Sequence, residues 1–493
     1  MPIIYKRLLE FFIWLGASIL ATYYVPEIIR TGFYILLLVA YFRSKNEAMF
    51  LALFLVLNDG FWGFFNNYEV VLGIIPGLPP IEIGHLYIAL TIVKAAKRTF
   101  EPPPLFYKAF MLTLAVYVVF LVVQGHMLGL APQMNIRFRV VKHIFPLMLF
   151  YSIPRLFPTE RDYREIFFYI FPMAFAALFA QVFTITTGTT PSQFLGVHRD
   201  FWFTVDVNKG KTYRGFYSTG VILISFFGAM YYLAHKEKSF NFIYLFAILA
   251  ANFLSVFLSA TRGWLLGLGF PLILFLIFVL KLSAQNLAKI GVTTIVLTGG
   301  LMLIPVVGKQ FTNAVLRFTT LEKLAAGDVT AGGTLERLDK RAPPVVDKWE
   351  ESPLTGWGFS DDFMEVQDFH VGNQNILMHS GILGGLLMLM FFIYYHFKLF
   401  ARSRILPKDN PLREALLVFV VFFPGWFMIH SSSGQHFAYY LDPNNAMIQA
   451  IYFTLGGVAY KTTLPKKKRR QFQYTDTETS EPETQLETTI KSD

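Results

Sequence analysis

Residues 336–385 read ERLDKRAPPVVDKWEESPLTGWGFSDDFMEVQDFHVGNQNILMHSGILGG, and they join the longest polar interval of an apolar chain to a further hydrophobic segment. The Pro-Pro pair at 343–344 favours the start of a short helix. The apolar stripe of that helix consists of Val345, Val346 and Trp349. The glycines of PLTGWGF (353–359) permit a tight turn. This stretch therefore predicts small amphipathic helices that lie over one face of a membrane.

The composition around this stretch is that of a polytopic membrane protein. The chain has 493 residues, of which 54% are hydrophobic and 15% are charged, whereas soluble proteins have about 25% charged residues. Apolar runs recur along nearly the whole chain, and a helix needs about 20 such residues to cross a hydrocarbon core of about 30 Å. The runs lack the strict alternation of barrel strands, so we expect the spanning elements to be helices.

We predict an all-α, polytopic transmembrane bundle of about 12–14 spans with a large extracytoplasmic loop that contains short amphipathic helices. The candidate spans are 8–25, 32–42, 47–65, 81–96, 106–130, 138–153, 165–187, 215–234, 240–258, 262–280, 289–307, 376–397, 412–430 and 445–460. The predicted parts are N-terminal transmembrane helices (1–213), central transmembrane helices (214–307), the extracytoplasmic loop (308–372), C-terminal transmembrane helices (373–460) and a disordered cytoplasmic tail (461–493).

The distribution of Lys and Arg predicts the orientation of these spans. If the N-terminus is cytoplasmic, every inside connection carries basic residues, while the outside connections 66–80 and 431–444 carry none. Some predicted outside segments nevertheless keep cations: Arg137, Arg139, Lys142, Arg199, Lys209, Lys211, Arg214 and several residues of the loop 308–372. A cation at the centre of a bilayer costs about 2.5–3.5 kcal/mol on insertion scales, so cations in or near the membrane usually have a partner. An anionic substrate is one candidate partner.

Several classes of chemistry are disfavoured by what the chain lacks. The absence of cysteine excludes disulfides, thiolate metal sites and Cys nucleophiles. No Walker loop, Rossmann fingerprint or Ser-elbow motif is present. The net charge of +10 follows from the bias toward basic inside loops, so we expect no nucleic-acid partner. The carboxylates of Asp361, Asp362, Glu365 and Asp368 lack a recognisable metal-loop spacing, and we interpret them as a solvated face, with no metal or other cofactor.

His370 is the best candidate for a reacting side chain. It follows an acidic, aromatic stretch and precedes the polar entrance VGNQN to the next span. Imidazole can accept a proton near neutral pH, which suits a general base acting on a hydroxyl nucleophile. The alternative interpretation is an ordinary interfacial histidine. We expect His379, nine residues later, to be a packing or hydrogen-bonding residue.

Three arginines fall on the same predicted side as His370, namely Arg214, Arg262 and Arg337. Guanidinium groups bind phosphate oxygens in pairs and stay charged at any working pH. Each arginine alone can be a structural or lipid-headgroup contact. Together they indicate a clamp for a diphosphate.

The segment ERLDKRAPPVVDKWEESPLTGWGF resembles the Arg-to-Pro-Leu-x-Gly-x-Gly segment of the bacterial O-antigen ligase and O-antigen polymerase superfamily. The histidine and the Gly-x-x-Gly of that family correspond to His370 and to Gly381 with Gly384. LSATRGWLLGLG and YRGFYSTG resemble two further helix starts of the family, so the resemblance covers about residues 214–385. An asparagine normally follows the histidine, and this chain has Val371 there, with Asn373 and Asn375 as possible substitutes.

The resemblance implies an inverting, metal-independent glycosyltransferase that moves a glycan from an undecaprenyl-diphosphate carrier to a sugar hydroxyl, either as a polymerase or as a ligase. It implies His370 as the general base and Arg214, Arg262 and Arg337 as binders of the diphosphate. The expected partners are the lipid-linked donor, a glycan or lipid A-core acceptor and membrane lipids. The expected location is the bacterial inner membrane, with the active site on the periplasmic side. The alternative is a transporter or flippase of lipid-linked oligosaccharide.

Overall fold

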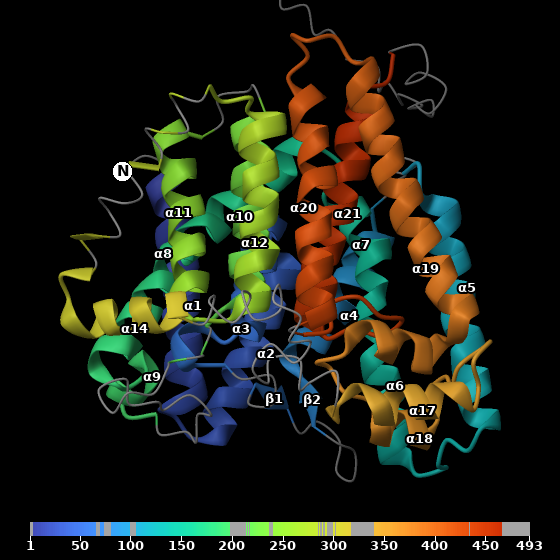
Figure 1. The fold of residues 1–493 in the computed structure, drawn as a ribbon. Helices are drawn as coiled ribbons and strands as arrows, with labels where there is room; N and C mark the ends of the chain where they lie inside the picture. Colours follow the sequence, from blue (N-terminus) through green and yellow to red (C-terminus); the bar gives the residue numbers. More distant parts are fainter. Residues whose placement is uncertain are drawn as a thin grey trace, which may run out of the picture.

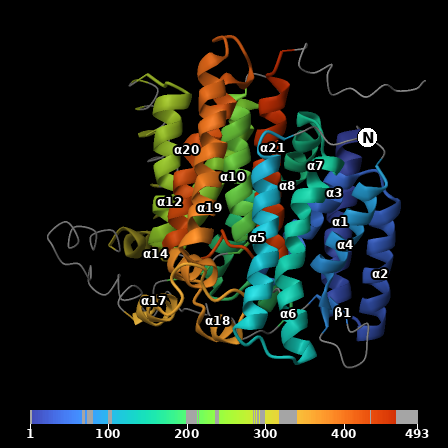
Figure 2. The same cartoon turned by 90° about the vertical axis from the view of Figure 1, so that its right-hand side faces the viewer.

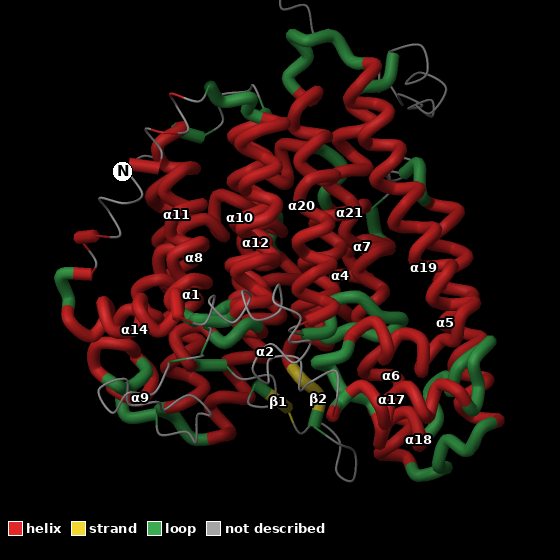
Figure 3. Tube along the Cα trace, viewed as in Figure 1, coloured by secondary structure: helices red, strands yellow, loops and turns green. Residues whose placement is uncertain are grey.

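The computed structural model describes residues 3–65, 70–72, 80–98, 105–197, 213, 215, 217–235, 240–283, 285, 288, 291–292, 299–300, 302–316, 340–432 and 434–465. Most of them are helical, and the long helices run side by side between two ends of the molecule (Figures 1 and 3). Two residue pairs form a minimal antiparallel ladder, β1 (Val71–Leu72) with β2 (Ile81–Glu82). The all-α prediction is therefore confirmed at this level.

The longer helices are α1 (Ile3–Tyr23), α2 (Glu27–Arg43), α3 (Glu47–Asn58), α4 (Ile83–Ala96), α5 (Lys108–Met127), α8 (Glu160–Thr187), α10 (Thr219–Ala234), α11 (Phe242–Leu258), α12 (Arg262–Leu274), α19 (Gly372–Ile405), α20 (Leu412–Ser432) and α21 (Pro443–Thr462). The shorter elements are η1 (Phe61–Gly63), α6 (Met134–Ile144), η2 (Phe145–Met148), α7 (Leu149–Leu156), α9 (Pro191–Phe194), the π-helical turn η4 (Phe275–Val279), α14 (Pro305–Leu316), α17 (Ala342–Glu350) and α18 (Asp361–Val366).

Within the described part of the chain, five helices are long and apolar enough to cross a membrane: α5, α8, α12 continued through η4, α19 and α20. Shorter apolar helices are α3, α4, α10 and α11. These lengths and compositions indicate a multi-pass helical membrane protein. The number of about 12–14 spans stays a prediction, and the candidate span 289–307 lies largely outside the described residues.

Several predicted spans are shorter or more broken than the apolar pattern suggested. The candidate 47–65 ends as a helix at Asn58, because Gly60 and then Trp62 take left-handed backbone angles (φ 77° and 52°). The candidate 138–153 is divided into α6, η2 and α7, with Pro146 in the break. By contrast, α8 is one continuous helix. A capping box of Thr159 and Asp162 fixes its start. It ends where Gly188 turns left-handed, and glycine adopts that conformation at little cost.

The short helices α6, α14, α17 and α18 gather at one end of the bundle in both views (Figures 1 and 2), and α9 lies at the same end in Figure 1. We call this end the capped face. At this face α12, α19 and α21 begin and α5 and α20 end. The loop that joins α19 to α20 lies at the opposite end, and it carries Lys408. The sequence places α17 and α18 within the predicted extracytoplasmic loop, so the capped face is the end where that loop packs.

Glycines let the central helices approach closely. A Cβ atom at Gly425 of α20 would meet the carbonyl oxygen of Gly267 in α12, and a Cβ at Gly267 would lie 2.9 Å from Gly425 O. Helices in membranes commonly pack through such small residues, because backbones that approach closely gain van der Waals contact. An aromatic core that includes Tyr395, Phe419 and Tyr452 fills the space between α19, α20 and α21.

Asp59 ties the end of α3 to the start of α10. Its carboxylate accepts hydrogen bonds from the amides of Gly220 (2.8 Å) and Val221 (2.6 Å), and from Asn444 Nδ2 of α21 (2.7 Å). A helix N-terminus has unpaired N–H groups and a positive dipole, so a carboxylate is a good partner there.

Replacing Asp59 by Ala is expected to lower the free energy of unfolding by about 1–3 kcal/mol, because buried amides of α10 lose their acceptor. Thermal unfolding of the purified protein should therefore show a lower Tm for Asp59→Ala than for wild type. Asp409→Ala, at an exposed turn, is the control and should change the Tm little. Equal Tm values for Asp59→Ala and wild type would contradict this assignment.

Candidate functional site

The site begins with an interruption inside α19. Gly381 has φ 63° and ψ −176°, so the regular hydrogen-bond ladder of the helix breaks there. The segment 353–358 occupies the break and replaces the missing partners. The hydrogen bonds run from Trp357 N to Met378 O (2.8 Å), Gly358 N to His379 O (2.8 Å), Ile382 N to Pro353 O (2.9 Å) and Leu383 N to Leu354 O (3.1 Å). We call this arrangement the loop–helix lock.

The glycines of the lock are required by space and by backbone angle. Gly356 has φ +71°, and a Cβ there would lie 2.5 Å from Gly381 N. Gly358 has φ +53°, and a Cβ there would lie 2.8 Å from Gly125 N in α5. Side chains at either position would be strained and would collide with backbone. The Pro-Leu-x-Gly-x-Gly pattern is thus explained by its contact with α19 and α5, which the sequence alone did not predict.

The acidic run after the lock is engaged in pairs and not solvated throughout, so the interpretation of a solvated face was partly wrong. Asp362 Oδ2 lies 2.7 Å from Lys348 Nζ, which also stands 3.7 Å above the Trp357 ring. Asp361 accepts a hydrogen bond from Ala131 N (3.1 Å). Among the described residues, no group of three or more acidic or histidine side chains has the proximity needed to hold a metal ion.

His370 lies half-buried in the turn between α18 and α19 at the capped face. Its backbone N–H donates to Asp368 Oδ1 (2.9 Å), and the Asp368 carboxylate lies 3.4 Å from Arg341 Nη1. Arg341, just before α17, thus connects the start of α17 to the turn that carries His370. Sequence reasoning missed Arg341, although its place in KRAPP, beside the helix-starting prolines, was a usable signal.

The expected asparagine after the histidine has two candidate replacements, and they have different environments. Asn373 Nδ2 donates to Ser431 Oγ (3.0 Å) at the end of α20. Asn375 is fully buried and donates to Gln435 Oε1 (2.6 Å) and to the hydroxyl oxygen of Tyr440 (3.0 Å). Val371 itself is buried among apolar residues. Polar side chains at this helix start therefore face the segment that joins α20 to α21.

Arg262 is the first residue of α12, and the start of α12 connects to the histidine turn through the end of α20. Trp264 packs its ring 5.9 Å from the ring of His436. His430 Nδ1 accepts hydrogen bonds from His436 N (3.1 Å) and Phe437 N (3.3 Å), so its hydrogen is on Nε2. A Cβ at Gly372, the first residue of α19, would lie 2.7 Å from His430 Cε1. Arg262 and His370 therefore lie at the same face, on elements joined by α20.

Arg214 and Arg337 lie outside the described residues. The two described neighbours of Arg214 are held close to the end of α11. Gln310 Nε2 donates to Tyr213 O (2.9 Å) and to Leu258 O (2.6 Å), while Gln181 Nε2 donates to Gly215 O (2.9 Å). Leu258 is the last residue of α11, only a short turn before Arg262. This part of the chain therefore belongs to the same face as α12.

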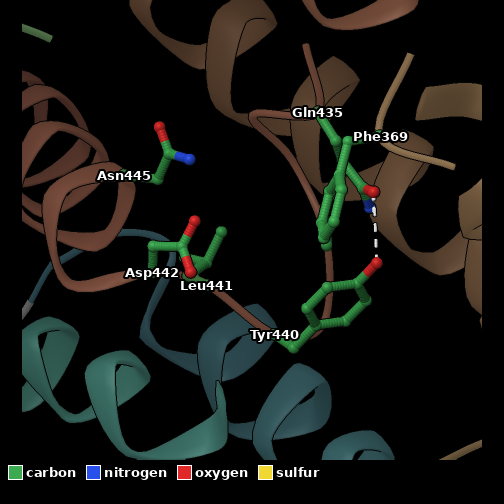
Figure 4. Close-up of a pocket in the computed structure, with 7 residues that line it drawn as sticks. Phe369, Gln435, Tyr440, Leu441, Asp442 and Asn445 are labelled. Carbon is green, nitrogen blue, oxygen red and sulfur yellow. Dashed lines mark hydrogen bonds between the residues drawn. The ribbon is translucent and has the colours of Figure 1, made fainter. Parts of the chain in front are cut away.

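A small pocket opens next to Phe369, the residue before His370. It is lined by Phe369, Gln435, Ala438, Tyr440, Leu441, Asp442 and Asn445. Figure 4 shows Phe369 beside Gln435, which hydrogen-bonds to Tyr440 (3.1 Å), with Asp442 and Asn445 across the pocket. Sequence reasoning noted only that 431–444 lacks Lys and Arg. The sequence feature that could have indicated a pocket in this segment is the density of amides and tyrosines, with one carboxylate, between two apolar runs.

The polar surroundings of this pocket also include an ion pair between helix α6 and strand β2. Lys142 Nζ of α6 lies 2.6 Å from Glu82 Oε1, and His85 of α4 lies 3.4 Å from the other oxygen of Glu82. Leu441 N donates to His143 O (3.0 Å), which fixes the pocket wall to α6. The charge of Lys142 is thus offset by Glu82.

Comparisons with known proteins do not assign the chain to a family. No protein-family model matches the chain, and no curated protein sequence is significantly similar to it. The capped face thus offers a half-buried imidazole, an arginine at the start of α12 and a small polar pocket next to Phe369. Such a set can accept a proton, bind an anion and hold a hydroxylated ligand.

The loop–helix lock predicts that Gly356→Ala and Gly381→Ala will be strongly destabilising, because each adds strain at positive φ and a clash with backbone. We expect a loss of about 2–4 kcal/mol in unfolding free energy, measured by thermal or denaturant unfolding in detergent. Gly129→Ala is the matched control, since Gly129 also has positive φ (+105°) but open space around it. If all three variants lost the same stability, the contact with α19 would not be the reason for the motif.

Proposed function

We propose that the chain is an integral-membrane glycosyltransferase that transfers a glycan from an undecaprenyl-diphosphate carrier to a sugar hydroxyl at the periplasmic face, as an O-antigen or exopolysaccharide polymerase or as an O-antigen ligase. It is proposed to be a bundle of about 12–14 spans in the bacterial inner membrane. The observation that carries the proposal is the loop–helix lock. It gives one physical reason for the two glycine motifs of the resemblance, because the loop motif fills the break that the helix motif creates.

In the proposed reaction the acceptor hydroxyl oxygen attacks the anomeric carbon of the donor sugar. A new C–O bond forms as the bond from that carbon to the phosphate oxygen breaks, with inversion. The hydroxyl proton passes to the His370 imidazole, and the electron pair leaves with the lipid diphosphate. Arg262, Arg214 and Arg337 are proposed to offset the charge of that leaving group, so electrostatic stabilisation and one proton acceptor suffice.

The position of His370 supports its proposed role. The turn that carries it is attached to α18 and to α19, and the Asp368–Arg341 pair fixes the backbone of the preceding residues. A catalytic side chain needs such support, because its geometry must hold within a fraction of an ångström. The same turn leaves the histidine half-buried, where both a substrate and solvent protons can reach it.

His370→Ala is expected to lower glycan transfer by about 10²–10⁴-fold, the usual contribution of a positioned general base. The measurement is product formation from a purified lipid-linked donor, with donor binding measured separately. Donor binding should persist in the variant. His126→Ala, an exposed histidine in the last turn of α5, is the control and should retain activity. Near-normal product from His370→Ala would contradict the catalytic role.

Arg262→Ala is expected to weaken binding of the diphosphate donor and to lower turnover by about 10²–10³-fold, with partial recovery in Arg262→Lys. The control is Arg137→Ala, an exposed cation of α6 at the capped face. A transporter or flippase would instead lose carrier translocation in these variants while forming no glycosidic bond in any variant.

The glycan profile of a deletion strain distinguishes a polymerase from a ligase. Loss of long chains with one unit retained indicates a polymerase, and loss of all attached chains indicates a ligase.

A further inference from the structure

The hydroxyl group of Tyr440 joins the two ends of the turn that carries His370. One end is Gln367, which follows the last residue of α18, and the other is Asn375, in the first turn of α19. Asn375 Nδ2 donates to the Tyr440 hydroxyl oxygen (3.0 Å), and that hydroxyl lies 3.3 Å from Gln367 Oε1, to which it can donate. His370 lies between the two ends in the sequence. We call the side chains of Gln367, Asn375 and Tyr440 the turn clasp.

Both amides of the turn clasp are oriented by further hydrogen bonds. Gln367 Nε2 donates to the carbonyl oxygen of Met364 (3.2 Å), which leaves Oε1 for the Tyr440 hydroxyl. Asn375 Nδ2 also donates to Gln435 Oε1 (2.6 Å), and this oxygen lies 3.1 Å from the same hydroxyl (Figure 4). The hydroxyl therefore meets one donor and two carbonyl acceptors. Because hydrogen bonds in a buried setting are stronger than in water, this network restrains the turn.

The ring of Tyr440 is fixed by the helices around the turn. Its centroid lies 5.5 Å from that of Phe363 in α18, 5.1 Å from that of His379 in α19 and 5.7 Å from that of His143 in α6. Burial raises the pKa of the Tyr440 phenol above its ordinary value. The hydroxyl consequently keeps its proton over the whole pH range in which an imidazole titrates.

Hydrogen bonds within the turn set its local shape. Asp368 Oδ1 accepts from His370 N (2.9 Å), and Asp368 O accepts from Val371 N (3.1 Å). Tyr440, by contrast, belongs to the connection between α20 and α21, so its hydroxyl attaches both ends of the turn to a distant part of the chain. Val371 stands where the resemblance expects an asparagine. The turn clasp supplies polar support to the histidine turn from Asn375 instead.

We propose that Tyr440 is a positioning residue for the proposed general base, because its hydroxyl fixes both ends of the turn that carries the His370 imidazole. The inference rests on the proposed function and deepens it. The proton of the acceptor hydroxyl still passes to His370, and Tyr440 gives up no proton. Loss of the Tyr440 hydroxyl should therefore disturb the geometry of proton transfer and leave the binding of both substrates in place.

The first test uses Tyr440→Phe, which removes the hydroxyl and keeps the ring. We expect kcat to fall about 10-fold to 100-fold, the size of effect that a small misplacement of a reacting group has. The KM values for donor and acceptor should stay within about 2-fold of wild type. Tyr439→Phe is the matched control, since Tyr439 is also buried and its hydroxyl donates to Gly384 O (2.7 Å) further along α19. An unchanged kcat in Tyr440→Phe, or an equal loss in both variants, would overturn the proposal.

The second test asks whether the turn clasp needs an acceptor at position 367. Gln367→Glu keeps a carboxylate oxygen for the Tyr440 hydroxyl and should retain most of the activity. Gln367→Met removes the acceptor and should lower kcat as Tyr440→Phe does. The double variant Gln367→Met/Tyr440→Phe should lose less than the product of the two single losses, because both changes remove the same bond. Equal damage from Gln367→Glu and Gln367→Met would refute a role for this hydrogen bond.

The third test measures the turn without catalysis, by hydrogen–deuterium exchange of amides 369–374 in lipid nanodiscs. Exchange should be about 10-fold faster in Tyr440→Phe than in wild type, because the turn opens more often, and unchanged in Tyr439→Phe. Unchanged exchange in Tyr440→Phe would overturn the turn clasp even if His370 proves catalytic. Faster exchange together with full transfer activity of His370→Ala would instead refute the proposed base, and with it the positioning role, while the contact between Tyr440 and the turn would stand.

Discussion

In a lipid environment every backbone amide and carbonyl that leaves a helical ladder needs a new partner, because no water is present to replace it. Gly381 creates that need in the middle of α19, and the backbone of 353–358 satisfies it. The loop is thereby attached to the helix by main-chain hydrogen bonds and not by side chains. Its position is consequently set by peptide geometry, which leaves little freedom. The turn with His370 lies between these two attached segments.

The capped face combines this fixed loop with charges that neutralise one another. Lys348 pairs with Asp362, Arg341 with Asp368, and Lys142 with Glu82. Exposed ion pairs contribute little stability individually, but they determine which charges remain for a ligand. A carboxylate at Asp442 and an open ring at Phe369 remain around the pocket. The pocket lining therefore has one carboxylate and no cation, whereas α12 begins with Arg262.

The sequence predicted the helices well where apolar runs were long and uninterrupted, as in α8, α19 and α20. It failed at 47–65, because the left-handed residues after Asn58 end the helix without a change in hydrophobicity. It could not predict that Asp59 caps α10, since the carboxylate and its amide partner are 161 residues apart. His370 and Arg262 were predicted to lie on the same side of the bundle, and the starts of α19 and α12 do lie together at the capped face. Arg341 and the pocket of 435–445 were missed, because their roles depend on contacts between distant segments.

The glycine contact between α12 and α20 limits how these two helices can move against each other. Gly267 and Gly425 bring the two backbones together, and the side chains of Ile429 and Pro271 pack closely around the contact. Sliding one helix along the other would force backbone atoms to collide. The pair therefore acts as a solid partition. Any hydrophobic ligand of the bundle is therefore expected to enter elsewhere than between α12 and α20.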